Sequence, residues 1–386
     1  MSSRSLTIIH QIYLISFLYA LAVSSSTILV PLFAQNMGAS YINIGIIASF
    51  QSLLFMFSSI LGGYFSDRFK KTHVISISVG FESLAIFALI FSGDLYQIIL
   101  LRCIAGICMG LYYPANEALV SSVSDVSNRV KNFSFFYISE TLGVMFGALI
   151  GGSVANIFGI KQSFIFSSII MFCAFGLANF SISPKYTPKK VNVISFRESF
   201  ASLSRSFKTL SLIMIPYGSL LGVILYVFPA YVNNLSFTPF WIGILFMFFR
   251  IGRIIGAFAV RYTSSKGDQM NIIVSGILFI SSFLLLSSFD SFELLAVSLI
   301  GAGIAGGLLF PTALNLATKI SPENKVGITI GSLEASIAAG MMVGPLFTSF
   351  LLENSNYGSP FVISSIFGLI ILVVGITWKK YHSNIN

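Results

Sequence analysis

The chain has 386 residues, of which 55% are hydrophobic and only 9% are charged. Soluble domains carry about 25% charged residues, so this composition excludes an ordinary soluble protein and predicts a polytopic membrane protein. The net charge of +9 does not call for a nucleic-acid partner, because membrane proteins collect Lys and Arg on cytoplasmic loops. The three cysteines lie in apolar runs without metal-ligand spacing, so we expect neither a metal nor another cofactor.

Apolar stretches long enough to cross a bilayer recur along the chain. A bilayer core of about 30 Å needs roughly 20 apolar residues per helix. The first stretch continues to about Phe33, which is too long for a cleaved signal peptide, so we interpret it as a transmembrane helix. An all-α membrane protein with twelve spans is predicted, at about 6–34, 42–66, 73–92, 95–124, 133–157, 161–182, 209–232, 238–261, 270–289, 292–318, 327–352 and 358–378.

The basic residues outside the spans are strongly biased to one side. If the N-terminus is inside, every Lys and Arg falls on an inner segment except Lys161, which is outside, and Arg102, Arg250 and Arg253, which lie within spans. The positive-inside rule then predicts a multi-pass protein of the cell membrane with both termini in the cytoplasm.

One long polar connection divides the spans into six and six. It covers 183–208 and is rich in Lys and Arg. We therefore expect an N-terminal six-helix bundle at 1–182, a basic cytoplasmic linker at 183–208 and a C-terminal six-helix bundle at 209–386.

The two halves match each other when the sequence is shifted by 197 or 198 residues. The matched pairs are Pro31 and Pro229, Asn36 and Asn234, Gly45 and Gly243, Gly106 and Gly303, and Gly110 and Gly307. Such a register predicts an internal duplication. Two parallel six-helix repeats are typical of alternating-access transporters, whose substrate site lies between the repeats near the membrane midplane.

Three local motifs are similar to those of the Major Facilitator Superfamily. The family's loop motif Gly-x-x-x-Asp-Arg/Lys-x-Gly-Arg/Lys-Arg/Lys is matched at Gly63, Asp67, Arg68 and Lys71, and its Arg-x-x-x-Gly pattern at Arg102 and Gly106. Its antiporter motif Gly-x-x-x-Gly-Pro-x-x-Gly-Gly is matched at Gly143, Gly147, Gly151 and Gly152, with Ala148 replacing the proline. The resemblance covers the whole chain and implies two pseudo-two-fold-related bundles of the drug and metabolite efflux type.

The loop motif suggests a latch on the inner side. Gly62 and Gly63 permit a neighbouring helix to approach the end of the second span. Asp67 is then placed to accept hydrogen bonds from the free N–H groups at the start of another helix, whose dipole favours an anion. The resemblance implies that this partner is the eleventh span, which begins near Gly327.

Arg68 has two candidate partners at the inner end of the fourth span. Asp125 is the first choice and Glu117 the second. We interpret the adjacent Lys70 and Lys71 as ordinary positive-inside charges.

Glycines four residues apart mark one face of the fifth span. Gly143, Gly147 and Gly151 permit close approach of another helix. This face is either an ordinary packing surface or the sliding seam between the bundles, and we expect interbundle packing here. The second half repeats the pattern, with the proline, at Gly340, Gly344 and Pro345.

Seven charged residues fall within predicted spans: Arg102, Arg250, Arg253, Glu82, Glu117, Glu140 and Glu334. Charges in the membrane are costly and point to function. Arg250 and Arg253 share a helix face. Either Arg253 pairs with Glu140 or Glu334, or an arginine holds an anionic substrate or resets a protonated carboxylate. Arg102 is assigned to proton handling by the family pattern, with pairing to helix-end carbonyls as the alternative.

The four glutamates are candidate proton carriers. Burial favours a neutral carboxyl and a nearby arginine favours the carboxylate, so moving an arginine between states loads and releases a proton. Glu140 and Glu334 are preferred because their spans face the seam in the family, Glu117 follows, and Glu82 ranks last because its span is peripheral there. The first span has no acid in AVSSSTILVP, which disfavours coupling at that place and leaves a facilitator open.

The sequence thus predicts a monomeric secondary active transporter that moves a small molecule by alternating access. Proton-coupled efflux of an apolar or amphipathic compound is the preferred function. An uptake symporter or a facilitator for an organic solute is the alternative. A membrane-embedded enzyme and a channel are disfavoured because no HExxH, nucleophile elbow, phosphate loop or short repeated pore motif occurs.

Overall fold

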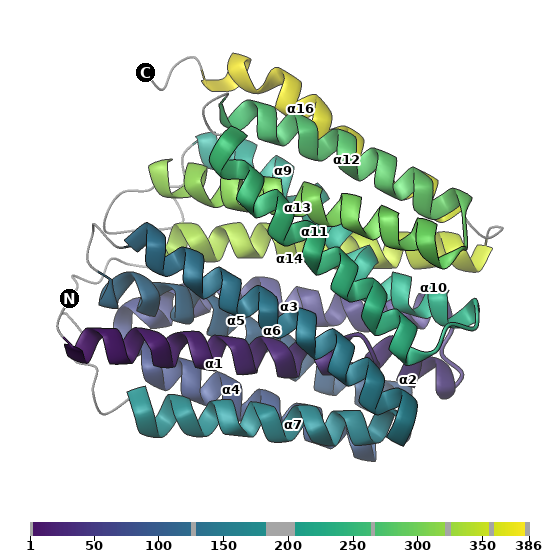
Figure 1. Cartoon of the computed structure of the whole chain (residues 1–386), viewed down its shortest axis with the longest axis horizontal. Helices are drawn as coiled ribbons and strands as arrows, with labels where there is room; N and C mark the ends of the chain where they lie inside the picture. The colour runs from purple at the N-terminus through teal and green to yellow at the C-terminus, as the bar shows by residue number, and fades with distance from the viewer. Residues whose placement is uncertain are drawn as a thin grey trace.

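The computed structural model describes residues 3–124, 129–182, 205–263, 267–320, 326–354 and 359–382, and these contain helices and turns but no strand. Within them, 12 helical segments are long and apolar enough to cross a membrane. The helices run side by side, and both termini lie at one end of the molecule (Figure 1). The predicted twelve-span, all-α fold is confirmed. We call the end with the termini the terminal side and the opposite end the far side.

The N-terminal half contains the first six spans. Its elements are α1 (Ser3–Thr27), α2 (Val30–Asn36), α3 (Tyr41–Arg68), α4 (Lys71–Ala88), η1 (Leu89–Phe91), α5 (Leu95–Val123), α6 (Arg129–Phe158), α7 (Ile160–Leu177) and η3 (Ala178–Ile182). Helices α3 and α5 begin at polar caps. Ser40 Oγ accepts a hydrogen bond from the Asn43 N–H, and Asp94 Oδ1 accepts one from the Gln97 N–H, so two of the free N–H groups are satisfied.

The C-terminal half contains the other six spans. Its elements are α9 (Arg205–Gly222), η5 (Val223–Val227), α10 (Phe228–Asn234), α11 (Pro239–Thr263), α12 (Asp268–Ser288), α13 (Phe292–Ile320), α14 (Val326–Asn354), α15 (Ser359–Ser364) and α16 (Ile366–His382). Most of the predicted linker lies outside the described residues.

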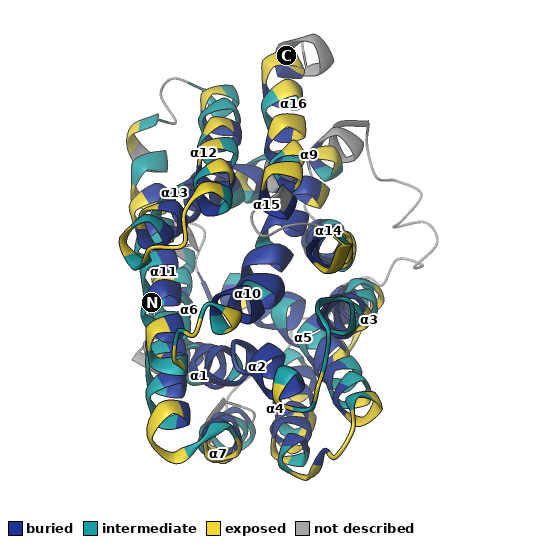
Figure 2. Ribbon diagram, turned by 90° about the vertical axis from the view of Figure 1, so that its right-hand side faces the viewer, coloured by how far each residue is buried: buried dark blue, intermediate teal, exposed yellow. Residues whose placement is uncertain are grey.

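The first span of each half departs from a regular α-helix close to the far side, and we call these two spans the broken spans. In the first half α1 ends at Thr27 and α2 follows with Pro31 in its first turn; in the second, the π-helical turn η5 leads into α10 with Pro229 in its first turn. Proline has no N–H to donate, so it is tolerated at the start of a helix and disrupts an interior. These two prolines are a matched pair of the repeat, and the short helices that they begin meet between the halves (Figure 2).

Two seams join the halves along their length. Helix α3 packs on α14, and α6 packs on α11. In the view from the far side, α4 and α7 lie at the outer edge of one half and α12 and α16 at that of the other (Figure 2). Each half also repeats one internal contact. A Cβ at Gly110 would collide with α3, and a Cβ at its counterpart Gly307 would collide with α11.

Gly143, Gly147 and Gly151 of the antiporter motif, and their counterparts Gly340 and Gly344, pack within a half, so the prediction that they form the interbundle seam is wrong. Cβ atoms at Gly143, Gly147 and Gly151 would meet Phe17, Leu21 and Ser25 of α1. Those at Gly340 and Gly344 would meet Ile215 and Ser219 of α9, and Pro345 faces Gly222 of the same helix.

The seams use neighbouring small residues instead. Gly152 faces Pro239 and Gly243 faces Ala148 where α6 crosses α11, while Gly45 faces Leu346 and Ser349 where α3 crosses α14. A four-residue spacing of glycines shows that a helix has a close-packing face, but it does not say which neighbour covers that face.

Candidate functional site

A cluster of buried and partly buried charged side chains lies between the halves. It consists of Glu117 on α5, Glu140 on α6, Arg250 and Arg253 on α11, and Glu334 on α14. Glu117 is 2% exposed and Arg250 is 8% exposed, and the other three side chains are partly buried. We call these five residues the charged cluster. It joins two carboxyls of the N-terminal half to two bases and one carboxyl of the C-terminal half.

The charges of this cluster act on one another across the seam. The strongest charged neighbours of Glu140 are Arg253 and then Arg250. Those of Glu334 are Glu140 and Arg253, and Glu117 is close to Glu334 and Glu140. The positive charge of Arg253 therefore acts on both Glu140 and Glu334. Five of the seven charged residues predicted within spans come together here, and Arg102 and Glu82 lie elsewhere.

Hydrogen bonding in the charged cluster is incomplete. The Tyr137 hydroxyl donates to Glu117 Oε1 at 2.7 Å, and the Tyr113 hydroxyl interacts with Glu140. Glu117 Oε2 and Arg250 Nε are both buried, yet neither atom has a hydrogen-bond partner among the described residues. A buried polar atom without a partner costs roughly 1–3 kcal/mol. Such atoms are retained at places where a ligand, an ion or a proton is handled.

Aromatic rings surround the two bases. The Arg250 guanidinium carbon lies 5.4 Å from the centroid of the Phe249 ring, and that of Arg253 lies 6.0 Å from the Phe310 centroid. The Phe310 ring in turn meets the edge of Tyr137, 6.0 Å between centroids. These cation–π contacts hold the arginines without neutralising them.

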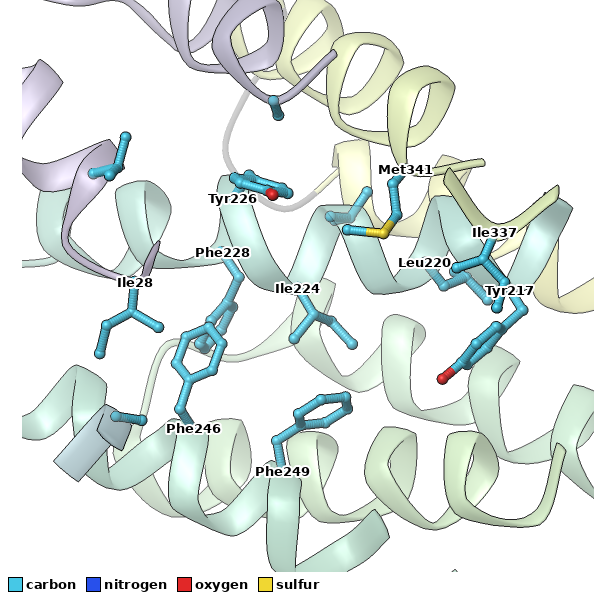
Figure 3. Close-up of a cluster of buried hydrophobic side chains, with 14 of the residues drawn as sticks. Ile28, Tyr217, Leu220, Ile224, Tyr226, Phe228, Phe246, Phe249, Ile337 and Met341 are labelled. Carbon is cyan, nitrogen blue, oxygen red and sulfur yellow. The ribbon is translucent and has the colours of Figure 1, made fainter. Parts of the chain in front are cut away.

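An apolar layer covers the charged cluster on the far side. Because α11 starts on the far side, Phe246 and Phe249 precede Arg250 and lie above it. Figure 3 shows their rings beside Phe228 and Ile224 of the broken span, with Ile28 of the N-terminal half near by. Phe228 and Phe246 are at most 1% exposed. A solute that reaches the cluster therefore contacts aromatic and aliphatic carbon as well as charge.

Hydrogen bonds between the halves close the far side. Asn233 Nδ2 donates to Gln35 Oε1 at 2.9 Å, and Gln35 Nε2 donates to the Ala230 carbonyl and to Asn234 Oδ1, both at 3.1 Å. Asn234 Nδ2 donates to the Tyr41 hydroxyl at 2.7 Å, and the Tyr41 N–H donates to Glu353 Oε2 at 3.0 Å. We call Gln35, Tyr41, Asn233, Asn234 and Glu353 the far-side gate.

The far-side gate was missed by the sequence analysis. Its signal is the repeat register, since Gln35 and Asn233 are 198 residues apart and so occupy matched positions beside the matched prolines. Two polar side chains that are related by the pseudo-two-fold axis, and lie close to it, face each other where the two halves meet.

The seam at the terminal side lies next to the predicted latch, which stays a prediction because the Asp67 side chain lies outside the part of the chain that the structure describes. Ser59 Oγ of α3 donates to the Gly331 carbonyl of α14 at 3.3 Å. From this contact α3 continues for about 12 Å to Asp67, and α14 reaches back about 8 Å to its start, so the end of α3 lies beside the start of α14. Gly62 faces the Gly110 backbone of α5, as expected for a close approach.

The described contacts of Arg68 lie within its own helix. Asp125 lies outside the described residues. Arg68 is exposed, donates to the Tyr64 hydroxyl of its own helix and lies 5.5 Å from the centroid of that ring. The second choice, Glu117, is buried in the charged cluster and bonded to Tyr137.

Arg102 occupies a different buried site, nearer the far side. It is 2% exposed; its Nε donates to Gln51 Oε1 at 3.0 Å and its Nη2 to Thr27 Oγ1 at 3.2 Å. The Tyr226 hydroxyl of the other half also interacts with this guanidinium. The acceptors described for Arg102 are thus side chains, whereas helix-end carbonyls were the expected alternative.

Comparison with known proteins agrees with this architecture. The model of the Major Facilitator Superfamily matches residues 12–291 and 271–384, which together cover nearly the whole chain. The chain belongs to the Major Facilitator Superfamily. Its members are transporters of small molecules, so this protein is a multi-pass membrane transporter. The charged cluster lies in the interior of that transporter, between its two halves.

Curated relatives include superfamily transporters with and without an assigned role. The chain is 23% identical to the uncharacterized MFS-type transporter YttB of Bacillus subtilis, covering 89% of this chain and 87% of that protein. It is 22% identical to the multidrug resistance protein MdtG of Proteus mirabilis, with 81% of each covered. It is 21% identical to the multi-drug resistance efflux pump PmrA of Streptococcus pneumoniae, with 91% and 90% covered.

Solved superfamily structures share the fold. A bacterial homolog of the human lysosomal transporter Spinster, in an inward-facing and unoccupied conformation, matches with a TM-score of 0.76 at 13% identity and 99% coverage of both chains. A POT family transporter in complex with 5-aminolevulinic acid matches with a TM-score of 0.80 at 12% identity, covering 97% of this chain and 96% of that one.

Proposed function

We propose that this transporter exports apolar or amphipathic small molecules in exchange for protons, through alternating access to the charged cluster. The observation that carries the proposal is the composition of that cluster. It holds three carboxyls, two arginines and an unpaired carboxylate oxygen, and it draws them from both halves. Each monomer contains the complete cluster, so transport requires no second copy.

The charge balance of the cluster favours a bound proton. With every group ionised, three carboxylates would face two guanidiniums and leave one negative charge in a poorly solvated place, which is costly. Protonation of one carboxyl removes that charge. The cluster is therefore suited to hold one proton in this conformation.

Movement of the halves provides the coupling. Glu140 lies on α6 and its strongest partners lie on α11, so a rocking motion at this seam changes the distance between carboxyl and base. An approaching arginine favours proton release and a departing arginine favours proton uptake. A lipophilic cation that occupies the cluster has the same effect as an arginine and displaces the proton.

The names of two relatives and the apolar layer support efflux of apolar or amphipathic compounds. MdtG and PmrA are named for multidrug resistance and efflux, and the aromatic rings beside the arginines provide a surface of matching chemistry. An antiport direction is also favoured by the glycine motif of α6 and its proline-containing counterpart in α14.

Reconstituted vesicles test the proposal with ethidium as the lipophilic cation. A pH gradient should drive ethidium across the membrane against its own gradient, and collapse of the pH gradient should stop it. Glu140→Gln should reduce driven transport to background, because the amide neither binds nor releases the proton. Glu293→Gln, at the exposed start of α13, is the matched control and should behave as wild type.

Three outcomes count against the proposal. Wild-type rates in Glu140→Gln would remove Glu140 from the coupling mechanism. Ethidium that equilibrates but never accumulates at any pH gradient would identify a facilitator. Accumulation in the direction of proton flow would identify an uptake symporter.

A further inference from the structure

A second buried carboxyl lies outside the charged cluster. Glu82 stands on α4, whose neighbours are other helices of the N-terminal half. Its side chain is nevertheless only 2% exposed, and its Oε2 accepts a hydrogen bond from the Tyr19 hydroxyl of α1 at 2.7 Å. The carboxyl therefore points into the half and away from lipid. The peripheral position of the helix had ranked Glu82 last among the sequence candidates.

The partner of Glu82 belongs to a group of packed tyrosines. Tyr19 is fully buried and stacks on Tyr112 with 3.5 Å between ring centroids, while the edge of Tyr113 is 5.9 Å away. The Tyr112 hydroxyl accepts a hydrogen bond from Asn116 Nδ2, at 2.8 Å. This packing fixes the donor to Glu82, so the carboxyl cannot exchange partners by a simple side-chain rotation.

One base faces this carboxyl. The groups that interact with Glu82 are Tyr19 of α1, Arg102, Cys108, Tyr112 and Tyr113 of α5, and Tyr226 of η5. Helix α7 packs on α4 through Ser168 and Phe175, which carry no charge. Only Arg102 in this group bears a positive charge, so its position decides which protonation state of Glu82 is favoured.

In the present conformation Arg102 is engaged elsewhere. It donates to Gln51 and Thr27, and it interacts with Tyr226 across the interface. Thr27 is the last residue of α1, immediately before the break, and Tyr226 lies in the π-helical turn of the opposite half. The guanidinium is thus held by the two broken spans, whose short helices meet at the far side.

The tyrosines also connect the two carboxyl sites. The Tyr113 ring contacts Tyr19 and Tyr112, and its hydroxyl interacts with Glu140 of the charged cluster. Glu82 and Glu140 therefore both interact with Tyr113.

We propose that Glu82 is a second proton-exchanging carboxyl of the transport cycle, whose protonation is set by contact between Arg102 and the opposite half. This inference rests on the proposed proton-coupled function. Movement of the halves changes the contact between Tyr226 and Arg102. Where the guanidinium turns to Glu82, the carboxyl O–H bond breaks and the proton passes to water as hydronium. Where Arg102 returns to its neutral acceptors, Glu82 takes a proton from hydronium.

Infrared difference spectroscopy of the purified full-length protein tests proton exchange without transport. Wild type should show a protonated-carboxyl C=O band that disappears as pH rises, and Glu82→Gln should lack that band. Tyr19→Phe keeps the ring stacking and removes the hydrogen bond, so it should shift the band frequency. Arg102→Met should preserve the band to higher pH. A spectrum that Glu82→Gln leaves unchanged at every pH would overturn the proposal.

Ethidium transport gives the second measurement. Glu82→Gln should retain ethidium exchange across vesicles without a gradient and lose accumulation driven by the pH gradient. Driven accumulation at the wild-type rate would also overturn the proposal. Failure of the general function looks different: wild type itself would not respond to the pH gradient, whereas the Glu82 band would still titrate in the infrared spectrum.

Discussion

At the scale of single residues, the free-energy cost of burying a polar atom distinguishes side chains with a functional role from side chains that only pack. Within the described part of the chain neither Glu117 Oε2 nor Arg250 Nε has a hydrogen-bond partner, although an apolar side chain at either place would avoid the penalty. The same reasoning applies to glycine, because a missing side chain is favourable in a helix only where another backbone fills the space. Some glycines of this chain lie against another backbone, and others have open space beside them.

Gly147 and Gly176 form a matched pair for this distinction. A Cβ at Gly147 would strike the Leu21 backbone of α1, whereas a Cβ at Gly176 meets nothing within 4 Å. Gly147→Ala should therefore lower the melting temperature of the detergent-solubilised protein, because overpacking costs about 1–3 kcal/mol. Gly176→Ala should leave it unchanged or raise it, since alanine is the better helix former by about 1 kcal/mol.

Thermal unfolding followed by fluorescence-detected size exclusion measures both variants. A rise in the melting temperature of Gly147→Ala would contradict the packing of α6 on α1. Loss of stability in Gly176→Ala would contradict the open space around α7.

Sequence reasoning predicted the members of the charged cluster from a single physical fact, the cost of charge inside a membrane. It failed where side-chain direction decides. Glu82 was ranked by the position of its helix, and the direction of a side chain around a helix axis depends on neighbours that the sequence does not reveal. Gly143 was assigned to the wrong neighbour for the same reason.

At the scale of elements, the broken first spans link gating to the buried sites. Helices α2 and α10 carry Gln35 and Asn233 of the far-side gate, and the preceding residues Thr27 and Tyr226 hold Arg102. Pro31 and Pro229 lie in the first turns of the short helices, where each lacks the N–H that would bond back to the preceding turn. A small rotation of α10 against α2 therefore changes contacts at the gate and at Arg102 together.

Cross-linking of the far-side gate tests its movement. In a background with Cys103, Cys108 and Cys173 replaced by alanine, Gln35→Cys with Asn233→Cys should be joined by a short methanethiosulfonate cross-linker. Ethidium transport should then stop and recover on reduction, because the far side cannot open while the two side chains are tied.

The matched control lies within one half on the same side. The rings of Trp241 on α11 and Phe292 on α13 are 5.0 Å apart, so Trp241→Cys with Phe292→Cys should cross-link without loss of transport. Continued transport by the cross-linked Gln35 and Asn233 pair would rule out opening between α2 and α10.

The number and limits of the spans were largely predictable, and the breaks within them were not. Predicted span 95–124 corresponds to α5 at Leu95–Val123, and predicted span 292–318 to α13 at Phe292–Ile320. Hydropathy measures length in the membrane and is insensitive to one interrupted turn, so 6–34 was predicted as one helix although α1 ends at Thr27. Matched prolines in a repeat are the better guide to such a break.

At the scale of the whole molecule, the two seams are the surfaces on which the halves would rock in the proposed alternating-access cycle. Gly45 and Gly243, matched in the repeat, lie at the crossings of α3 with α14 and of α11 with α6. Contacts of the far-side gate lie on one side of these crossings. The Ser59–Gly331 contact and the proposed Asp67 latch lie on the other. A rigid rotation that opens one end must compress the other, so the two ends compete.

This competition predicts opposite effects for the two ends. Asp67→Asn weakens a charge at a helix start, about 0.3–2 kcal/mol, and should shift the population toward terminal-side opening by about 2- to 30-fold. Gln35→Ala removes far-side hydrogen bonds and should shift it the other way. Labelling of Ser59→Cys by a membrane-impermeant maleimide from the terminal side reports the population, because Ser59 is fully buried in the α3–α14 seam.

Labelling should rise in Asp67→Asn, fall in Gln35→Ala and return toward the starting rate when both changes are combined. Lys70→Gln, an exposed neighbour of Asp67, is the control for loss of charge and should label at the starting rate. If Asp67→Asn labels and transports ethidium as the unchanged protein does, the latch does not exist. If the double variant labels as fast as Asp67→Asn alone, the latch opens without rocking, and the far-side gate and the latch act independently.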